Sequence, residues 1–69
     1  MDVRAEWPGL VREIHVDVGA VVAADDELVT LESMKMLTPV LAPSAGRVSD
    51  VVVHVDDYVE EGATLLRLE

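Results

Sequence analysis

The sequence predicts an all-β domain of roughly eight short strands arranged in two sheets. Three observations support this fold class. Apolar and polar residues alternate at a period of two, the chain repeats itself internally, and no segment combines a helical period with capping residues. Because the chain has only 69 residues, we expect residues 1–69 to form one domain.

The internal repeat relates residues 9–32 to residues 46–69. A shift of 37 positions lays one half over the other without a gap, and eight of the 24 pairs are identical. The identical pairs are Gly9/Gly46, Val11/Val48, Val16/Val53, Val18/Val55, Val22/Val59, Leu28/Leu65, Leu31/Leu68 and Glu32/Glu69. Each half is too short to fold alone, so we expect the two to pack face to face about a pseudo-twofold axis.

The first strand of each half alternates apolar and polar residues. The apolar residues expected on the core side are Ile14, Val16, Val18, Val51, Val53 and Val55. The alternation slips by one residue within Val11–Ile14 and again within Val48–Val51, and this recurrence predicts a β-bulge in both strands. Residues 28–31 and 65–68 are short apolar runs that are typical of buried strands.

Composition argues against several classes of function. The formal net charge is −9, which disfavours binding to nucleic acids and to anionic membranes. With two histidines and no cysteine, the chain is poorly suited to a structural zinc site. The opening residues 1–4 lack the basic-then-apolar order of a signal peptide, so we expect a cytoplasmic location.

The junction between the halves is the most informative segment. Residues 32–36 must reverse the chain, yet they include no glycine, proline, asparagine or aspartate. They do include Lys35, which is the only lysine of the chain and is expected at an exposed tip. A lysine without activating neighbours is protonated at neutral pH and is a poor nucleophile. Lys35 therefore suits an acceptor site that another protein modifies, and we expect no catalytic activity from the chain itself.

The junction resembles a known motif. The residues Glu32-Ser33-Met34-Lys35-Met36 resemble the E-(A/S)-M-K-M motif of the biotinyl domain family, the biotin carboxyl carrier proteins. Residues 7–11 resemble the M-P-G-x-V segment of that family, with Trp7 in place of Met, and residues 41–48 resemble its R-A-P-x-x-G-x-V segment. The resemblance covers nearly the whole chain, from about residue 3 to residue 68.

The resemblance implies a fold and a function. The fold would be a flattened eight-stranded barrel-sandwich hybrid with internal pseudo-twofold symmetry and the modified lysine on an exposed hairpin turn. Lys35 would receive biotin through an amide bond made by a biotin protein ligase. The carrier would then take a carboxyl group between biotin carboxylase and carboxyltransferase sites, as in a biotin-dependent acyl-CoA carboxylase.

The other motif residues have expected roles as well. Ser33 belongs to the motif, and Met34 and Met36 would give an adaptable apolar surface around the tether, although Met36 is as readily explained by packing. Glu32 would help orient the motif for the ligase, but Glu69 occupies the equivalent place in the other half, so a structural role is at least as well supported.

Two aspartates stand where the family often has glycine in its turns. They are Asp25 and Asp56. Because Asp tolerates left-handed backbone conformations better than most residues, we expect the fold to be kept.

Other functions remain open on the sequence alone. The same fold could carry lipoate, or accept both groups, although methionine on both sides of Lys35 favours biotin over the D-K-A pattern of lipoyl motifs. A free-standing biotinylated protein without carboxylase partners is a further alternative. An unmodified adaptor domain of this architecture is disfavoured by the intact motif.

A metal or hydrolytic site has little support in the sequence. His15 and His54 are expected as solvated surface residues, since they are not equivalent in the repeat. Ser33 and Ser44 have no evident histidine partner for nucleophilic catalysis. Trp7 is expected as a plug in the core.

Overall fold

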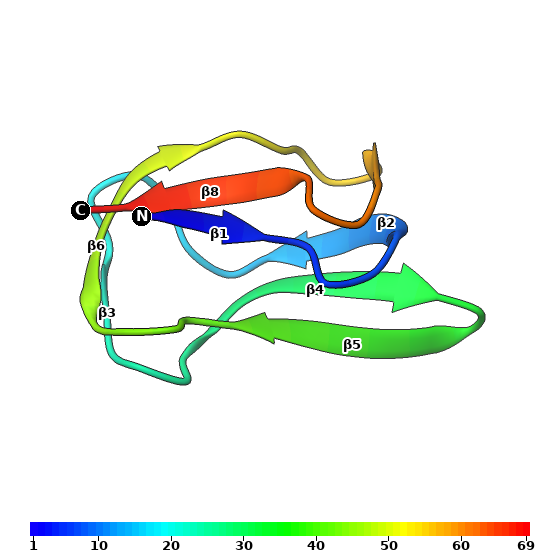
Figure 1. Ribbon diagram of the computed structural model, residues 1–69, viewed down its shortest axis with the longest axis horizontal. Coiled ribbons are helices and arrows are strands. Elements are labelled where there is room, and N and C mark those ends of the chain that lie inside the picture. The colour runs from blue at the N-terminus through cyan, green and yellow to red at the C-terminus, as the bar shows by residue number, and fades with distance from the viewer.

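The computed structural model describes all 69 residues as eight strands in two four-stranded antiparallel sheets (Figure 1). The strands are β1 (Asp2–Arg4), β2 (Gly9–Ile14), β3 (Val21–Val22), β4 (Glu27–Ser33), β5 (Met36–Leu41), β6 (Gly46–Val51), β7 (Tyr58–Val59) and β8 (Thr64–Leu68). One sheet has the order β1-β8-β6-β3 and the other β5-β4-β2-β7. The all-β, two-sheet prediction is confirmed. No helix in the structure is long and apolar enough to span a membrane.

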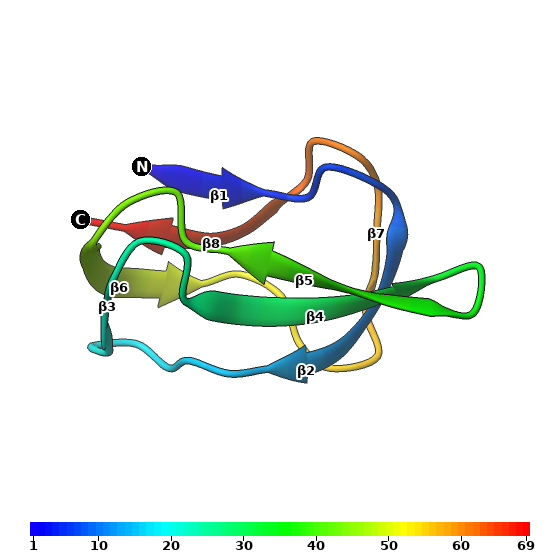
Figure 2. The ribbon, with the colours of Figure 1, turned by 90° about the horizontal axis from the view of Figure 1, so that it is seen from below.

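The two halves exchange their shortest strands. β3 belongs to the first half but pairs with β6 of the second, with Val22 opposite Gly46. β7 belongs to the second half but pairs with β2 of the first, with Val59 opposite Gly9. Figure 2 shows β7 beside β2, far from β3 at the other end of the molecule. Neither half can complete its sheet alone, because each depends on a strand from the other.

The strand register repeats with the same 37-residue shift as the sequence. The corresponding pairs are Val11↔Leu31 and Val48↔Leu68, Glu13↔Thr30 and Asp50↔Arg67, and Val3↔Leu66 and Val40↔Val29. The register shifts between Val11 and Glu13, and again between Val48 and Asp50. The two predicted β-bulges are therefore present at equivalent places, which supports the pseudo-twofold symmetry of the fold.

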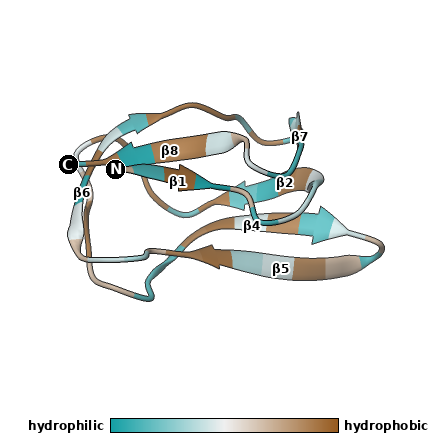
Figure 3. Ribbon diagram, in the orientation of Figure 1, coloured by the Kyte–Doolittle hydropathy of each residue, from teal (hydrophilic) through white to brown (hydrophobic).

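The core lies between the two sheets and draws on both halves. The largest fully buried side chains are Leu28, Leu31, Leu65, Leu66, Val11, Val29 and Val48. β4 and β8 lie in opposite sheets, and each has a hydrophobic stretch (Figure 3) whose leucine and valine side chains are buried. Burying each such side chain contributes about 1.5–3 kcal/mol, so these apolar runs supply much of the drive to fold.

The predicted inward face of the first strands extends too far. Val18 and Val55 were expected on the core side but are 60% and 50% exposed. The reason is that β2 ends at Ile14 and β6 ends at Val51, so the chain beyond each strand runs as a surface loop. Val16 and Val53 in the same loops still pack on the core, so the alternation fails only at its last apolar position in each half.

The turns confirm the expected tolerance of aspartate. Asp25 and Asp56 have φ angles of 72° and 78°, in the left-handed region. Their equivalents in the opposite halves are Gly62 and Gly19, with φ angles of 85° and 94°. The same backbone conformation is thus reached with Asp in one half and Gly in the other.

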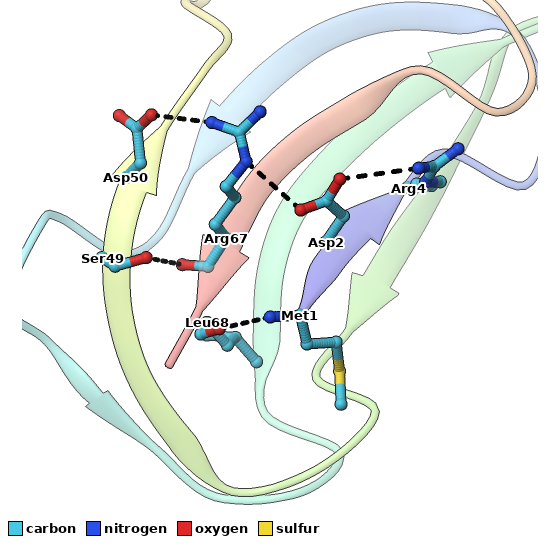
Figure 4. A network of polar contacts seen from close by, with 7 residues as sticks. All are labelled: Met1, Asp2, Arg4, Ser49, Asp50, Arg67 and Leu68. Atoms are coloured by element: carbon cyan, nitrogen blue, oxygen red, sulfur yellow. Dashed lines mark hydrogen bonds and ion pairs between the residues drawn. The ribbon is translucent and has the colours of Figure 1, made fainter.

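A polar network fastens the chain ends to the outer face of the first sheet (Figure 4). The Arg67 guanidinium on β8 donates to Asp2 at 3.2 Å and to Asp50 at 3.1 Å. The amino group of Met1 donates to the carbonyl oxygen of Leu68 at 2.7 Å. Both termini consequently lie at one end of the molecule, opposite the β4–β5 hairpin (Figure 1).

Candidate functional site

The site is built on the β4–β5 hairpin, which forms one end of the molecule (Figure 2). Ser33 pairs with Met36 as the last rung of the ladder, which leaves a two-residue turn of Met34 and Lys35. Both turn residues have positive φ angles, 51° for Met34 and 65° for Lys35. Positive φ at both central residues identifies a type I′ turn, whose twist matches that of the flanking strands.

This turn is energetically unfavourable for its sequence. A left-handed conformation costs a residue with a Cβ atom roughly 1–2 kcal/mol, and the usual residues here are Asn and Gly. Met34 and Lys35 adopt it because the long β4–β5 ladder and the buried residues of β4 determine the register. Strain of this kind at an exposed tip indicates that these side chains are kept for a reason other than stability.

Lys35 is exposed and takes part in none of the ion pairs of the structure. The methionines on either side are also exposed, Met34 by 92% and Met36 by 68%. The lysine amine is therefore accessible to another protein and is surrounded by flexible apolar side chains that can adapt to a partner surface.

Glu32 is held by an ion pair at the base of the hairpin. Its carboxylate accepts a hydrogen bond from Nε of Arg12, and the Arg12 Nη1 lies 4.0 Å from Asp56. The hydrogen bond and the charge of Glu32 raise the pKa of Arg12 above its ordinary value, with a smaller contribution from Asp56. Glu32 therefore connects the hairpin to the bulged strand β2, which is a structural role.

Sequence reasoning did not identify Arg12. It lies at the bulge of β2, where the register shifts between Val11 and Glu13. The signal was available, since a bulge re-aims the side chain of the extra residue. The equivalent residue in the second half is Ser49, whose hydroxyl bonds to the carbonyl oxygen of Arg67 instead of to a carboxylate. The Arg12–Glu32 pair thus occurs only in the first half, next to the junction that contains Lys35.

The histidines and serines considered for catalysis do not form a site. Nε2 of His15 lies 2.8 Å from Oγ1 of Thr30, whose hydroxyl donates to Glu27 at 2.8 Å. Because that hydroxyl proton is used, His15 is the donor to Thr30. His54 lies beside Asp57 in a different loop, with its side chain 86% exposed.

Neither serine contacts a histidine. Ser33 is half-buried at the end of β4, and the hydroxyl of Ser44 lies 4.0 Å from the sulfur of Met1. No group of three or more potential metal ligands comes together in the structure.

Trp7 does not plug the core, and that expectation is wrong. Its side chain is 47% exposed and lines a surface cavity of about 350 Å³ together with Pro39, Leu41 and Pro43. The interior is already filled by leucine and valine from the two sheets. A bulky indole in the connection between β1 and β2 has no room inside, and it packs over the edge of the sandwich instead.

Comparison with known proteins places the chain in a family. Residues 1–68 match the family model of biotin and lipoyl attachment domains that is described as "Biotin-requiring enzyme". The chain is 51% identical over 61 residues to the biotinylated protein TB7.3 homolog of Mycobacterium leprae, covering 88% of this chain and 86% of that protein.

Two further matches are to parts of much larger proteins. One is the dihydrolipoyllysine-residue acetyltransferase component of the pyruvate dehydrogenase complex of Cupriavidus necator, 49% identical over 57 residues, covering 83% of this chain and 10% of that protein. The other is the solved structure of a single-chain, multi-domain long-chain acyl-CoA carboxylase, which superimposes with a TM-score of 0.91 at 38% identity, covering 96% of this chain and 7% of that one.

The family match spans almost every residue, and the two-sheet fold described above agrees with it. The chain belongs to the biotin/lipoyl attachment domain family, whose members act as carrier domains.

Proposed function

We propose that this protein is a biotin carboxyl carrier that accepts biotin on Lys35 from a biotin protein ligase in the cytoplasm. The observation that carries the proposal is the placement of Lys35. The only lysine of the chain lies on a strained, exposed two-residue turn between two exposed methionines. Nothing in the packing of the domain requires a lysine there.

The chain's own residues position the amine and leave its chemistry to the ligase. Nζ of Lys35 has no carboxylate or base beside it, so the ligase must remove its proton before it can react. Nζ then attacks the activated carboxyl carbon of biotin, an amide bond forms, and the activating group leaves. Attached biotin supplies a ureido nitrogen that can accept and release a carboxyl group.

The hairpin sets the direction in which the tether extends. The rigid ladder from Glu27 to Ser33 fixes the turn relative to the core, while the tether itself remains flexible. A tethered group is presented to each partner at an effective concentration in the ~mM range. We propose that biotin carboxylase and carboxyltransferase subunits are these partners, as the likeness to an acyl-CoA carboxylase suggests.

Lipoate on Lys35 is the second candidate, because one relative is named for a dihydrolipoyllysine residue. Biotin is favoured by Met34 and Met36, which flank the lysine as in the biotinyl motif, and by the relative named as a biotinylated protein. That relative is similar in length to this chain, so a free-standing biotinylated protein without carboxylase subunits is the alternative to a working subunit.

The proposal is tested by incubating the purified chain with a biotin protein ligase, biotin and ATP. We expect mass spectrometry to show one biotin adduct on wild type and none on Lys35→Arg. Lipoate ligase with lipoate serves as the competing reaction. An adduct that persists in Lys35→Arg, or a chain that only lipoate ligase modifies, would contradict the assignment. Capture of the biotinylated protein on streptavidin then identifies whether carboxylase subunits copurify.

A further inference from the structure

The side chains of this chain that a peroxide can attack are concentrated at the tip of the β4–β5 hairpin. The chain has no cysteine, so its sulfur is confined to three methionines. Two of them, Met34 and Met36, directly precede and follow Lys35, and the third is Met1. Thiols and thioethers are the protein groups on which peroxide oxidation is centred. A reaction of this protein with a peroxide is therefore expected mainly on these three side chains.

The three methionines differ in their exposure to solvent. Met34 is 92% exposed, Met36 68% and Met1 63%. The sulfur of Met1 also lies 4.0 Å from the hydroxyl of Ser44, which covers part of it. None of the three belongs to the buried core. Met34 should therefore be oxidised first, and oxidation at the tip should leave the packing of the interior unchanged.

The hairpin places these methionines next to the amine in space as well as in sequence. Met34 and Lys35 are the two central residues of the turn, and Met36 is the first residue of β5. Figure 2 shows the end of the hairpin extending beyond the rest of the molecule. An enzyme that reaches Nζ of Lys35 therefore also meets the side chains of Met34 and Met36.

We propose that Met34 and Met36 are a modification site for peroxides, and that their sulfoxides hold back the attachment of biotin to Lys35. The inference rests on the proposed function. With hydrogen peroxide as the oxidant, the thioether sulfur forms a bond to one peroxide oxygen, the O–O bond breaks, and one molecule of water leaves. The sulfur loses two electrons and the peroxide gains them.

The effect on biotin attachment follows from what the ligase has to do. The ligase must strip water and a proton from Nζ of Lys35 before the amine can attack, so its surface has to close around the turn. Met34 and Met36 lose their surrounding water in the same step, because both are exposed beside the lysine. A thioether is apolar, whereas a sulfoxide is polar and costly to bury without a hydrogen-bond partner. The oxidised tip should therefore be the poorer substrate.

The same exposure allows the modification to be reversed. Methionine sulfoxide has two epimers, and each is reduced by its own reductase. Both enzymes have to bind the oxidised side chain, which the 92% exposure of Met34 permits. Peroxide would thus delay biotin attachment and the reductases would restore it, with the lysine itself unchanged.

The first test locates the sulfoxide and needs no ligase. Trypsin cuts after Lys35 and after Arg4, Arg12 and Arg47, so each methionine lies on its own peptide, namely 1–4, 13–35 or 36–47. After brief treatment with hydrogen peroxide, we expect mass spectrometry to show an added oxygen on peptide 13–35 before the other two. A sulfoxide that forms first on peptide 1–4 would overturn the proposal.

The second test measures biotin attachment. The protein is treated until both tip peptides are oxidised, catalase removes the remaining peroxide, and only then are the ligase, biotin and ATP added. We expect kcat/KM for attachment to be about tenfold lower than for the untreated protein, because a polar group is buried without a partner. Incubation with both sulfoxide reductases should restore it. The melting temperature should be the same before and after oxidation, which separates this effect from unfolding.

A variant with leucine at both tip positions is the matched control. Met34→Leu/Met36→Leu keeps apolar side chains of similar size that peroxide does not oxidise, and it retains Met1. Its kcat/KM after peroxide treatment is compared only with its own value before treatment. We expect these two values to be equal.

Three results of the second test would overturn the proposal. They are equal attachment to oxidised and untreated wild type, an equal loss in the double leucine variant, and a loss that the reductases do not reverse. A chain that the ligase fails to modify even before oxidation contradicts the proposed function, and the effect on attachment falls with it. The peptide map still decides whether the tip is the oxidised site.

Discussion

The guanidinium of Arg12 and the carboxylate of Glu32 are bonded across the pair of strands β2 and β4. The arginine comes from a β-bulge and the glutamate begins the motif that contains the lysine. The bulge therefore places an arginine where it anchors the base of the β4–β5 hairpin. The second half of the chain has Ser49 at the equivalent place and has no such ion pair.

This pair should be detectable by a double-mutant cycle. We expect Arg12→Ala and Glu32→Ala each to lower the melting temperature slightly, and the double variant to lower it by less than the sum. Since both side chains are partly exposed, the coupling should shrink in 1 M salt, where screening is strong. Strictly additive effects at low salt would show that the contact contributes nothing to stability.

Relief of turn strain should stabilise the domain. Met34→Gly removes a Cβ atom from a residue with a φ angle of 51°, and we expect a gain of about 1 kcal/mol. In a domain of this size that raises the melting temperature by roughly 4–8 °C. The control is Met36→Gly, within β5, which should lower it. A lower melting temperature for Met34→Gly would show that the methionine side chain stabilises the tip.

Gly9 should be far less tolerant of a side chain than its equivalent Gly46. A Cβ atom on Gly9 would lie 2.7 Å from the backbone oxygen of Glu32, in the centre of the sheet. On Gly46 it would lie 3.0 Å from the backbone oxygen of Glu69, which is a smaller overlap.

The two alanine substitutions should therefore lower the free energy of unfolding by different amounts. We expect Gly9→Ala to cost about 1–3 kcal/mol in urea unfolding and Gly46→Ala distinctly less. Equal losses of stability would mean that the difference between the two contacts has no energetic effect. Because the shift falls on Glu32, Gly9→Ala should also slow ligase modification of Lys35, measured on the folded fraction.

Pro39 should protect the exposed edge of β5 from pairing with another molecule. The strand has Leu37 and Leu41 exposed by 64% and 45%, and a proline there removes one backbone donor. We expect Pro39→Val to raise the weight-average mass in analytical ultracentrifugation relative to wild type, with Pro43→Val, which lies outside the strand, as the control. No increase in mass would show that the edge is protected by other means.

Much of the fold could be predicted because it follows from local chemistry that the sequence displays twice. The paired slips near Val11 and Val48 gave the bulges, and Asp25 and Asp56 could be recognised as left-handed turn residues. The exchange of β3 and β7 could not be predicted, since two-residue strands carry no pattern of their own. Their partners are decided by how the halves pack.

The site was predictable only in part, for a similar reason. Lys35 stood out as a solitary residue in a turn that lacked turn residues, and the structure places it on an exposed tip. The Arg12–Glu32 pair and the exposure of Trp7 depend on contacts between segments distant in sequence. From the sequence alone, a single tryptophan in a valine-rich chain is expected in the core. Only the structure shows that smaller apolar side chains already fill the interior.

The pairing of β1 with β8 has a consequence for biosynthesis. Asp2 of β1 pairs with Arg67 of β8, so β1 cannot join its sheet until β8 has been synthesised. Such non-local pairing is expected to slow folding to the millisecond-to-second range. The lysine-bearing segment precedes β8 in the chain, so on the ribosome it is translated before the sheets can close, and the β4–β5 hairpin is fixed on the finished core only once β8 is available.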